Sequence, residues 1–545
     1  MKHLLITASI LATAAIGASA QSSIEMLQLT QPDFRGTARF MGMGGAFTAL
    51  GGDLSTMTQN PAGLGIYRHS EIGATLDINI QNTKAPNGSN GWNKNDKTQA
   101  ACNNFGYIGV ANLGTNSAMQ TFAWGVTYNR VQQFDRRYRA YAPSTQTSLT
   151  NYIASFSNGI PADKLNFGED YNPYRDSNND WLSILAFNSY LITPQQGTTD
   201  TYNGLYQPGV TTGDAGIDVR ERGWMDEYNI SFGGNVSNVV YWGLGVGITD
   251  LSYRRDVSYS ESMANASVNN FWGNQTATVD GNAGYYLDNA KKITGSGFKL
   301  DFGVIVKPIN ELRIGAAIHT PTWWKLDEDY QAYTDYSFFN NSMAEGTDNP
   351  RADSEYSDWA AFSWKLKAPW RFMVGAAAVL GQNAIISIDY ERQAFNDMTL
   401  KNAEYDNYGY IYDYVSNDNV NNNVKKYCKA ANIIRVGAEY RVTPKFSIRA
   451  GYNHTSSNIS DSAMDGNIEI ATSGTDPSYR FDKSTQNITF GLGYRFGAFY
   501  VDGTYVHTTR KSDLHAYTNS TAGTAPSWEV TDNNNQLVFS LGFRF

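Results

Sequence analysis

Apolar and polar residues alternate along the last nine residues of the chain, which is the period of a β-strand with one apolar side and one polar side. The apolar side carries Leu537, Phe539, Leu541, Phe543 and Phe545. A water-soluble sandwich rarely ends on an unprotected apolar edge, whereas a closed membrane barrel pairs its last strand with its first. We therefore expect this strand to close an antiparallel β-barrel whose outer surface faces lipid.

The same alternation recurs along the chain in about fourteen segments bounded by turn residues. They lie near residues 70–81, 105–113, 120–131, 226–236, 239–257, 295–307, 310–320, 363–380, 383–393, 430–441, 444–455, 484–496, 499–509 and 535–545. Tight turns alternate with long polar stretches, of which the longest covers 132–225. This alternation predicts an all-β fold, a transmembrane barrel of about 14 strands with short periplasmic turns and long outer loops in 70–545.

Charged residues take the side of these segments opposite the apolar one. An Arg or Lys facing lipid at the midplane would cost about 2–4 kcal/mol, so the charged side should face the lumen. The lumen-facing set is Arg313, Asp389, Glu391, Arg435, Glu439, Arg441 and Arg449. It could hold a plug or line a wet pore. Near Thr249–Asp250 the apolar residues change phase, which indicates either a β-bulge or the membrane interface.

Residues 1–20 have the pattern of a cleaved signal peptide. A lysine at position 2 precedes an apolar run from Leu4 to Gly17, and Ala18-Ser19-Ala20 provides the small residues of a cleavage site. The run is too short for a membrane-spanning helix. Residues 21–69 do not alternate, and their many small residues suit close packing in a confined space. We expect them to form an N-terminal plug in the lumen.

One sequence motif in this segment resembles a motif of a known family. The residues Asp53, Ser55, Asn60, Pro61, Ala62 and Gly63 match a D-x-S-x-x-x-x-N-P-A-G pattern, which is similar to the plug of the outer-membrane transport family that includes the long-chain fatty-acid and toluene channels. Two segments nearer the C-terminus, Ile434–Arg441 and Phe490–Arg495, show a weaker similarity to the same family. The resemblance implies a plugged fourteen-strand barrel that admits hydrophobic small molecules by diffusion and releases them sideways into the membrane.

An apolar helix is predicted in the longest loop, beginning after the potential N-cap residues Asn178–Asp180. The resemblance implies that loop helices form a first groove for ligands, so the candidate capture residues are Trp181, Leu182, Ile184, Leu185 and Phe187. The alternative is that this helix packs over the barrel mouth. Trp323–Trp324 and Phe271–Trp272 could assist it or belong to an aromatic girdle at the membrane interface.

Composition narrows the function classes. The chain has a net charge of −9, so it gives no support to nucleic-acid binding, and its 2 cysteines exclude a disulfide scaffold and Cys-rich metal sites. Its 6 histidines are scattered without a His-x-x-x-His pair, and no Gly-x-Ser-x-Gly elbow is present. We expect no enzyme activity, no cofactor and no metal.

The sequence thus predicts a monomeric outer-membrane channel for hydrophobic small molecules, surrounded by outer-membrane lipid. Phe545, the last residue, would be recognised by the outer-membrane insertion machinery. Two alternatives stay open at this stage. One is a receptor for haem or another ligand that acts through its loops, and the other is a porin for polar solutes.

Overall fold

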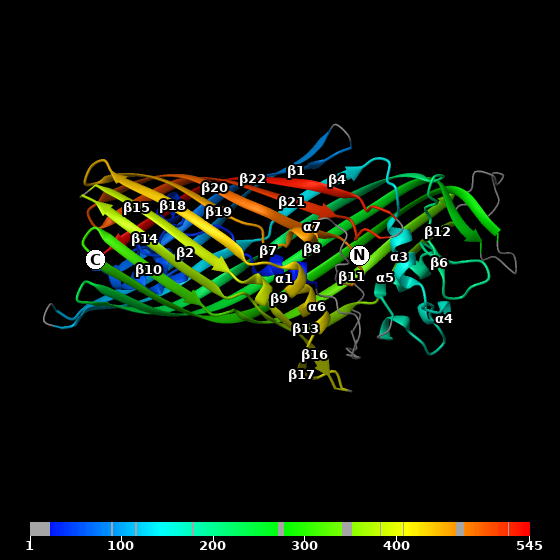
Figure 1. Cartoon of the computed structure of the whole chain (residues 1–545), viewed down its shortest axis with the longest axis horizontal. Helices are drawn as coiled ribbons and strands as arrows, with labels where there is room; N and C mark the ends of the chain where they lie inside the picture. Colours follow the sequence, from blue (N-terminus) through cyan, green and yellow to red (C-terminus); the bar gives the residue numbers. More distant parts are fainter. Residues whose placement is uncertain are drawn as a thin grey trace, which may run out of the picture.

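The computed structural model describes residues 22–545 apart from 89–90, 115–116, 177–178, 271–276, 340–350, 382, 407, 465–473 and 521–522. Twenty strand segments form one sheet, and several of them follow one another along a single path, so the wall is a closed antiparallel barrel of 14 strands. Figure 1 shows the tilted wall, with the C-terminus at one end and the helices α3, α4 and α5 at the other. We call these the turn end and the loop end.

The barrel strands, in order, are β1 (Glu71–Pro86), β2 (Trp92–Asn112), β3 (Met119–Gln133) continued by β4 (Arg136–Ala142), β7 (Thr212–Val236), β8 (Val240–Asn270), β9 (Ala277–Ile309), β10 (Leu312–His319) continued by β11 (Trp323–Phe339), β12 (Arg351–Tyr356) continued by β13 (Ala360–Lys367) and β14 (Arg371–Leu380), β15 (Ala384–Gln393) continued by β16 (Thr399–Tyr405), β18 (Ala431–Arg441), β19 (Phe446–Thr455), β20 (Tyr479–Phe496), β21 (Phe499–His515) and β22 (Ser527–Arg544). Strand β17 (Ile411–Ser416) pairs with β16, and β5 (Thr193–Pro194) pairs with β6 (Tyr202–Asn203).

The helices are short. They are α1 (Ser23–Thr30), α2 (Ala38–Gly42), α3 (Leu149–Ser157), α4 (Ala162–Leu165), α5 (Trp181–Asn188), α6 (Asp418–Tyr427) and α7 (Asp461–Met464), with 3₁₀ turns η1 (Leu54–Thr58), η2 (Pro61–Ile66), η3 (Pro173–Arg175) and η4 (Phe395–Asp397). Among the described residues, no helix is both long enough and apolar enough to cross a membrane.

The predicted closure of the barrel by the last strand is confirmed. β22 pairs with β1 from Glu71↔Arg544 to Lys84↔Thr531. The backbone N–H of Phe545 donates to the carbonyl of Ser70, and that of Ser70 donates to the carbonyl of Phe545, each over 3.0 Å. The terminal aromatic residue therefore belongs to a hydrogen-bonded seam and not to a free edge.

Most of the predicted strand segments coincide with the part of the wall whose outer side is apolar, and the segments 239–257 and 363–380 extend beyond it. On β8, for example, Leu244, Val246 and Ile248 are exposed outside the barrel. Beyond them the pattern inverts: Leu251 and Tyr253 point inward and are buried, while Arg254 is exposed outside. Pairing of β8 with β9 continues without a shift from Val240 to Met263. The phase change at Thr249–Asp250 is therefore the edge of the exposed apolar band, and the bulge alternative was wrong.

Strands extend past this edge toward the loop end, so the loops are shorter than predicted. Strand β4 ends at Ala142 and β7 begins at Thr212, which leaves a loop of residues 143–211 where the sequence predicted 132–225. The loop helices and the inward apolar residues of the surrounding strands form one buried cluster, which we call the mouth cluster. It closes the loop end of the barrel as a hydrophobic core.

Candidate functional site

The N-terminal segment, residues 22–69, makes its polar contacts with side chains that point inward from the wall. The backbone N–H of Thr48 donates to Asp389 (2.8 Å), and Arg313 donates to the carbonyl of Leu50 (2.7 Å). Arg39 forms an ion pair with Glu439 over 3.0 Å. Three of the predicted lumen-facing residues therefore hold the segment inside the barrel.

The other predicted lumen-facing residues divide into two groups. Glu391 is fully buried and forms ion pairs with Arg371 (2.7 Å) and Arg435, while Arg449 bridges Glu439 (2.6 Å) and Asp502. Arg441 differs, because it is exposed at the turn end of β18. It shares the inward phase of the strand but lies beyond the enclosed lumen.

The motif that carries the family resemblance shapes the segment itself. Asp53 is the N-cap of η1 and accepts hydrogen bonds from the Ser55 N–H (2.9 Å) and the Thr37 hydroxyl (2.7 Å). Asn60 caps η2, which begins at Pro61, and donates to the carbonyl of Thr48 (2.6 Å). Ala62 and Gly63 are buried in that turn. In the structure these residues fold the segment and do not line the cavity described next.

Glycines let this segment lie directly against the wall. Gly437 and Gly451 are opposite each other on β18 and β19. A Cβ at Gly437 would stand 2.2 Å from the Met43 carbonyl oxygen, and one at Gly451 would stand 2.1 Å from the Gly44 nitrogen. Gly44 has φ +61°, and a Cβ there would meet the backbone of Tyr452 at 2.8 Å. Backbone therefore touches backbone across this contact.

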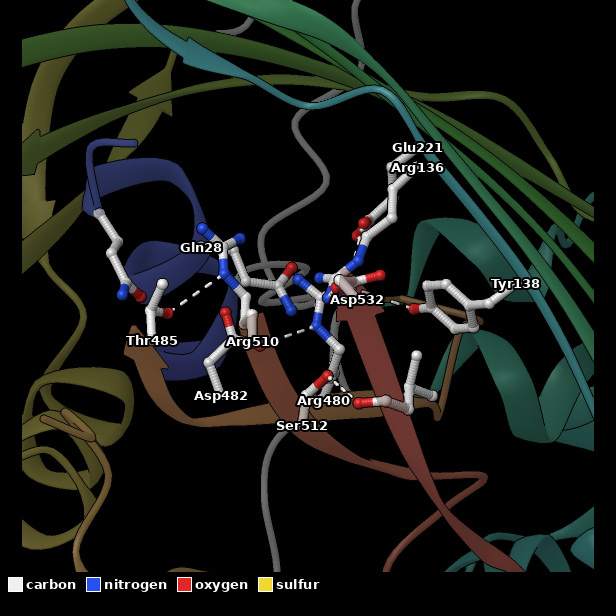
Figure 2. A network of polar contacts seen from close by, with 12 residues as sticks. Gln28, Arg136, Tyr138, Glu221, Arg480, Asp482, Thr485, Arg510, Ser512 and Asp532 are labelled. Atoms are coloured by element: carbon white, nitrogen blue, oxygen red, sulfur yellow. Dashed lines mark hydrogen bonds and ion pairs between the residues drawn. The ribbon is translucent and has the colours of Figure 1, made fainter. Parts of the chain in front are cut away.

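A cavity of about 180 Å³ lies between the N-terminal segment and the wall. Fourteen Asn or Gln, eight basic and six acidic side chains are among its lining residues. Figure 2 shows part of this lining: Arg480 donates to Glu221 (2.9 Å), and Arg510 donates to Thr485 (3.3 Å). Arg136 and Asp532 form a further ion pair nearby. The cavity is thus strongly polar and suits hydrogen-bonding groups or water.

Two arginines that line this cavity retain free hydrogen-bonding capacity. Arg435 and Arg136 are 8% and 6% exposed. Arg435 Nη1 and Arg136 Nε donate to no atom of the described residues. Because buried N–H groups are rarely left unpaired, water or a polar group of a ligand would be expected beside them.

The wall has a break beside the cavity. Strands β2 and β3 pair only from Asn112↔Thr121 to Asn104↔Asn129. Farther toward the loop end, β2 continues on β1, whereas β3 and β4 continue on β7. Across the break, Lys97 and Asp135 form an ion pair of 2.6 Å. Asn103 and residues 130–136 line both the break and the cavity.

This break lies at the height of the exposed apolar band. Leu76, Ile78 and Ile80 of β1 are exposed on the outside of the barrel. They pair with Cys102, Ala100 and Thr98 of β2, which are all beyond the last β2–β3 pair. The strands therefore separate where the neighbouring strand still presents apolar side chains on the outside of the barrel.

The five candidate capture residues lie at the barrel mouth. Trp181, Leu182, Ile184 and Leu185 are buried in the mouth cluster, with the Trp181 ring 4.8 Å from that of Tyr174 and 5.3 Å from that of Tyr330. Phe187 is half-buried at its edge. None of the five lines the polar cavity. This is the arrangement expected for a helix packed over the mouth.

The other aromatic candidates are separated. Trp324 is buried inside, whereas Trp323 is exposed outside, with its ring 5.0 Å from that of Phe298, as expected for the girdle alternative. Phe271 and Trp272 lie outside the described residues.

Cys102 and Cys428 are both free, and burial raises the pKa of the Cys428 thiol to about 12.

Sequence reasoning missed most of the cavity. Asn79, Gln81, Asn103 and Asn129 face inward from β1, β2 and β3, and all line it. The sequence nevertheless contains a usable signal. Where Asn or Gln residues alternate along a strand with apolar residues that face outward, the Asn and Gln side chains point into a polar lumen. The predicted lumen-facing set, by contrast, contains only charged residues.

Comparison with solved structures identifies the fold. A FadL homologue from Pseudomonas aeruginosa matches with a TM-score of 0.52 over 95% of this chain and 100% of its own, at 13% identity. The chain has the fold of that protein. The toluene transporters TodX of Pseudomonas putida (TM-score 0.46, 13% identity, 94% of this chain and 99% of that one) and TbuX of Ralstonia pickettii (0.42, 14%, 93% and 98%) also match. No family model and no curated protein matches the sequence.

Proposed function

We propose that this protein is an outer-membrane channel through which hydrophobic small molecules diffuse, leaving sideways between β2 and β3. The observation that carries the proposal is the break in the wall at the height of the lipid band, with a cavity directly behind it. The fold shared with the FadL homologue supports it. A sideways exit would spare an apolar compound from crossing water on its way to the membrane.

In this proposal, the N-terminal segment acts as the plug of the channel. Behind the break, the Asp33 N–H donates to the carbonyl of Val131 (3.0 Å), and its carboxylate accepts from the Gln133 N–H (2.9 Å). Arg35 donates to the Asn103 side chain over 2.6 Å. Residues 33–35 therefore hold the two sides of the break from inside. In this proposal, their displacement joins the cavity to the lipid.

Capture at the mouth belongs to the same proposal. The apolar face that contains Trp181, Leu182, Ile184, Leu185 and Phe187 is covered in the closed arrangement, so a ligand would enter when the loop of residues 143–211 lifts. Phe187 is the member at the edge of the cluster. We further propose that the barrel is a monomer and that Phe545, which is 57% exposed, contacts the insertion machinery.

A channel for polar solutes is a second candidate, and one observation favours it. The cavity is lined mainly by carboxamide and charged side chains, with few apolar residues such as Phe34, Phe40 and Ile433 among them. Small-molecule sites for apolar ligands usually have the opposite composition. In this second candidate function, the polar cavity would conduct polar solutes along the barrel axis.

Native mass spectrometry of detergent-purified protein, with extraction and analysis of lipids, separates the two functions. We expect a retained acyl or aromatic compound, and Phe187→Ala should weaken its binding roughly tenfold, because one buried aromatic contact is lost. Phe167→Ala, on the same loop and 45% exposed, is the matched control and should retain the ligand. Absence of any apolar ligand together with open ion conductance in planar bilayers would favour the polar-solute channel.

A further inference from the structure

A buried carboxylate of the wall holds the first turn of α3. Glu261 points inward from β8 and is 4% exposed. Its carboxylate accepts hydrogen bonds from the Leu149 N–H (2.9 Å), the Ser148 hydroxyl and the Tyr259 hydroxyl. Ser148 is the N-cap of α3 and accepts from the Thr150 N–H (3.0 Å). Glu261 therefore ties the start of α3 to the barrel wall.

The same helical turn also holds the returning half of the loop of residues 143–211, which we call the mouth loop. The Leu205 N–H donates to the Thr150 hydroxyl (2.9 Å). The Asn151 side chain donates to the Tyr206 carbonyl (2.8 Å) and accepts from the Tyr206 N–H (3.0 Å). Both halves of the mouth loop thus meet at the turn that the wall carboxylate fixes, so loss of that contact would loosen the loop as a whole.

Tyrosines surround this carboxylate, and among the described residues no basic side chain pairs with it. Tyr259 of β8 packs against Tyr285 of β9 and against Tyr517, with ring centres 6.5 and 6.3 Å apart, and all three phenols face Glu261. The sheet partner on β7 is an alanine, and the first turn of α3 contributes no charged side chain. His515, two residues before Tyr517, stacks on another tyrosine ring at 4.9 Å. By contrast, the two lumen glutamates described above form ion pairs with arginines.

Burial changes the proton affinity of Glu261 while the mouth loop is closed. The residue lies beyond the exposed apolar band, which ends on β8 at Thr249–Asp250. Burial disfavours the charged form and raises the pKa of the Glu261 carboxyl, and the hydrogen bonds from Ser148, Tyr259 and Leu149 offset only part of this rise. In a lifted loop the carboxyl would meet water and titrate with the ordinary pKa of glutamic acid, about 4.3. The closed loop therefore binds this proton more tightly than the lifted loop does.

We propose that Glu261 makes closure of the barrel mouth depend on pH, so that the mouth loop is held most firmly when this carboxyl is protonated and lifts more readily as the pH rises. Protonation keeps the contacts, because the carbonyl oxygen still accepts from the Leu149 N–H while the O–H donates to a neighbouring hydroxyl. Below about pH 4.3 both loop positions are protonated and closure is at full strength. As the pH rises from there through the raised pKa of the closed form, the ratio of lifted to closed loop increases by up to about tenfold per pH unit, because lifting releases one proton. The effect on uptake rests on the proposed entry of ligands through the mouth.

Electron paramagnetic resonance of a doubly spin-labelled protein in detergent measures the position of the loop by a signal that does not itself titrate. The labels are attached to cysteines at Ser155 of α3 and Ser337 of β11, which are both exposed, in a protein with Cys102 and Cys428 changed to serine. A lifted loop gives a longer distance between the labels. In the otherwise unchanged protein, the lifted fraction should rise by up to about tenfold per pH unit above about pH 4.3 and then level off. A lifted fraction that does not change with pH would overturn the proposal.

Glu261→Gln, in the same labelled protein, assigns the effect to this carboxyl. Its neutral amide still accepts from the Leu149 N–H but cannot ionise, so the lifted fraction should stay at its low-pH value throughout the titration. Glu169→Gln is the matched control, because Glu169 is exposed on the same loop, and it should follow the unchanged protein. A rise in Glu261→Gln equal to that of the unchanged protein would also overturn the proposal.

Uptake measurements separate this inference from the proposed channel. If the loop responds to pH while uptake of hydrophobic compounds does not, entry through the mouth is contradicted and the role of Glu261 stands. If the loop ignores pH while uptake persists, the role of Glu261 is contradicted and the channel proposal stands.

Discussion

Replacing Gly451 by alanine is expected to push the N-terminal segment off the barrel wall. The new methyl carbon would stand 2.1 Å from the Gly44 nitrogen and 2.4 Å from the Met43 carbonyl carbon. Both are backbone atoms, so no side-chain rotation can relieve the contact. The cost should be about 3 kcal/mol, at the upper end for overpacking.

Trypsin accessibility measures this displacement, because Arg35 and Arg39 are enclosed in the barrel when the segment is seated. A cost of that size would raise the population of the open segment, and hence the cleavage rate at these arginines, roughly hundredfold. Gly503→Ala is the control, since its methyl carbon would meet only the Phe539 ring at an ordinary 3.7 Å. Equal cleavage of both variants would show that the segment does not rest on Gly451.

Replacing Glu439 by alanine should strongly destabilise the protein. Glu439 is 6% exposed and lies between Arg39 and Arg449, at 3.0 and 2.6 Å. Its loss leaves Arg39 without that partner in a buried position. Removing one member of a buried ion pair typically costs about 3–5 kcal/mol.

Urea unfolding of the protein refolded into lipid vesicles measures this loss. Arg441→Ala provides the control on the same strand, because Arg441 is exposed at the turn end and exposed substitutions usually change stability by about 0.5 kcal/mol or less. If both variants unfold at the same urea concentration, the charges of the lumen do not hold the segment in place.

The lipid-facing half of the barrel could be predicted from sequence because its chemistry is one-sided. On β18, Ile434 and Val436 are exposed on the outer side while Arg435 and Glu439 face the lumen, and this alternation is typical of a strand in a membrane barrel. Alternation and turn residues were enough to identify all fourteen strand paths of the wall.

The loop-end half could not be predicted because its pattern is that of a soluble protein. Beyond Thr249, β8 turns Leu251 and Tyr253 inward and Arg254 outward. The sequence pattern predicts a polar loop for the later part of β8, residues 258–270, although that part continues the same strand. The break between β2 and β3 could not be predicted from the sequence either, because Asn104 and Asn129, the last residues that pair, do not differ in type from the residues next to them in the cavity wall.

We propose that hydrophobic compounds leave through the break between β2 and β3. Cysteines at Lys97 and Asp135, whose side chains meet across it at 2.6 Å, can be joined by a short bismaleimide in a protein with Cys102 and Cys428 changed to serine. Uptake of a long-chain fatty acid or of toluene by cells is then measured before and after cross-linking. Cross-linking is expected to lower uptake to that of cells without the protein, while either single cysteine, treated in the same way, should leave uptake unchanged. Undiminished uptake through a fully cross-linked barrel would contradict the sideways exit.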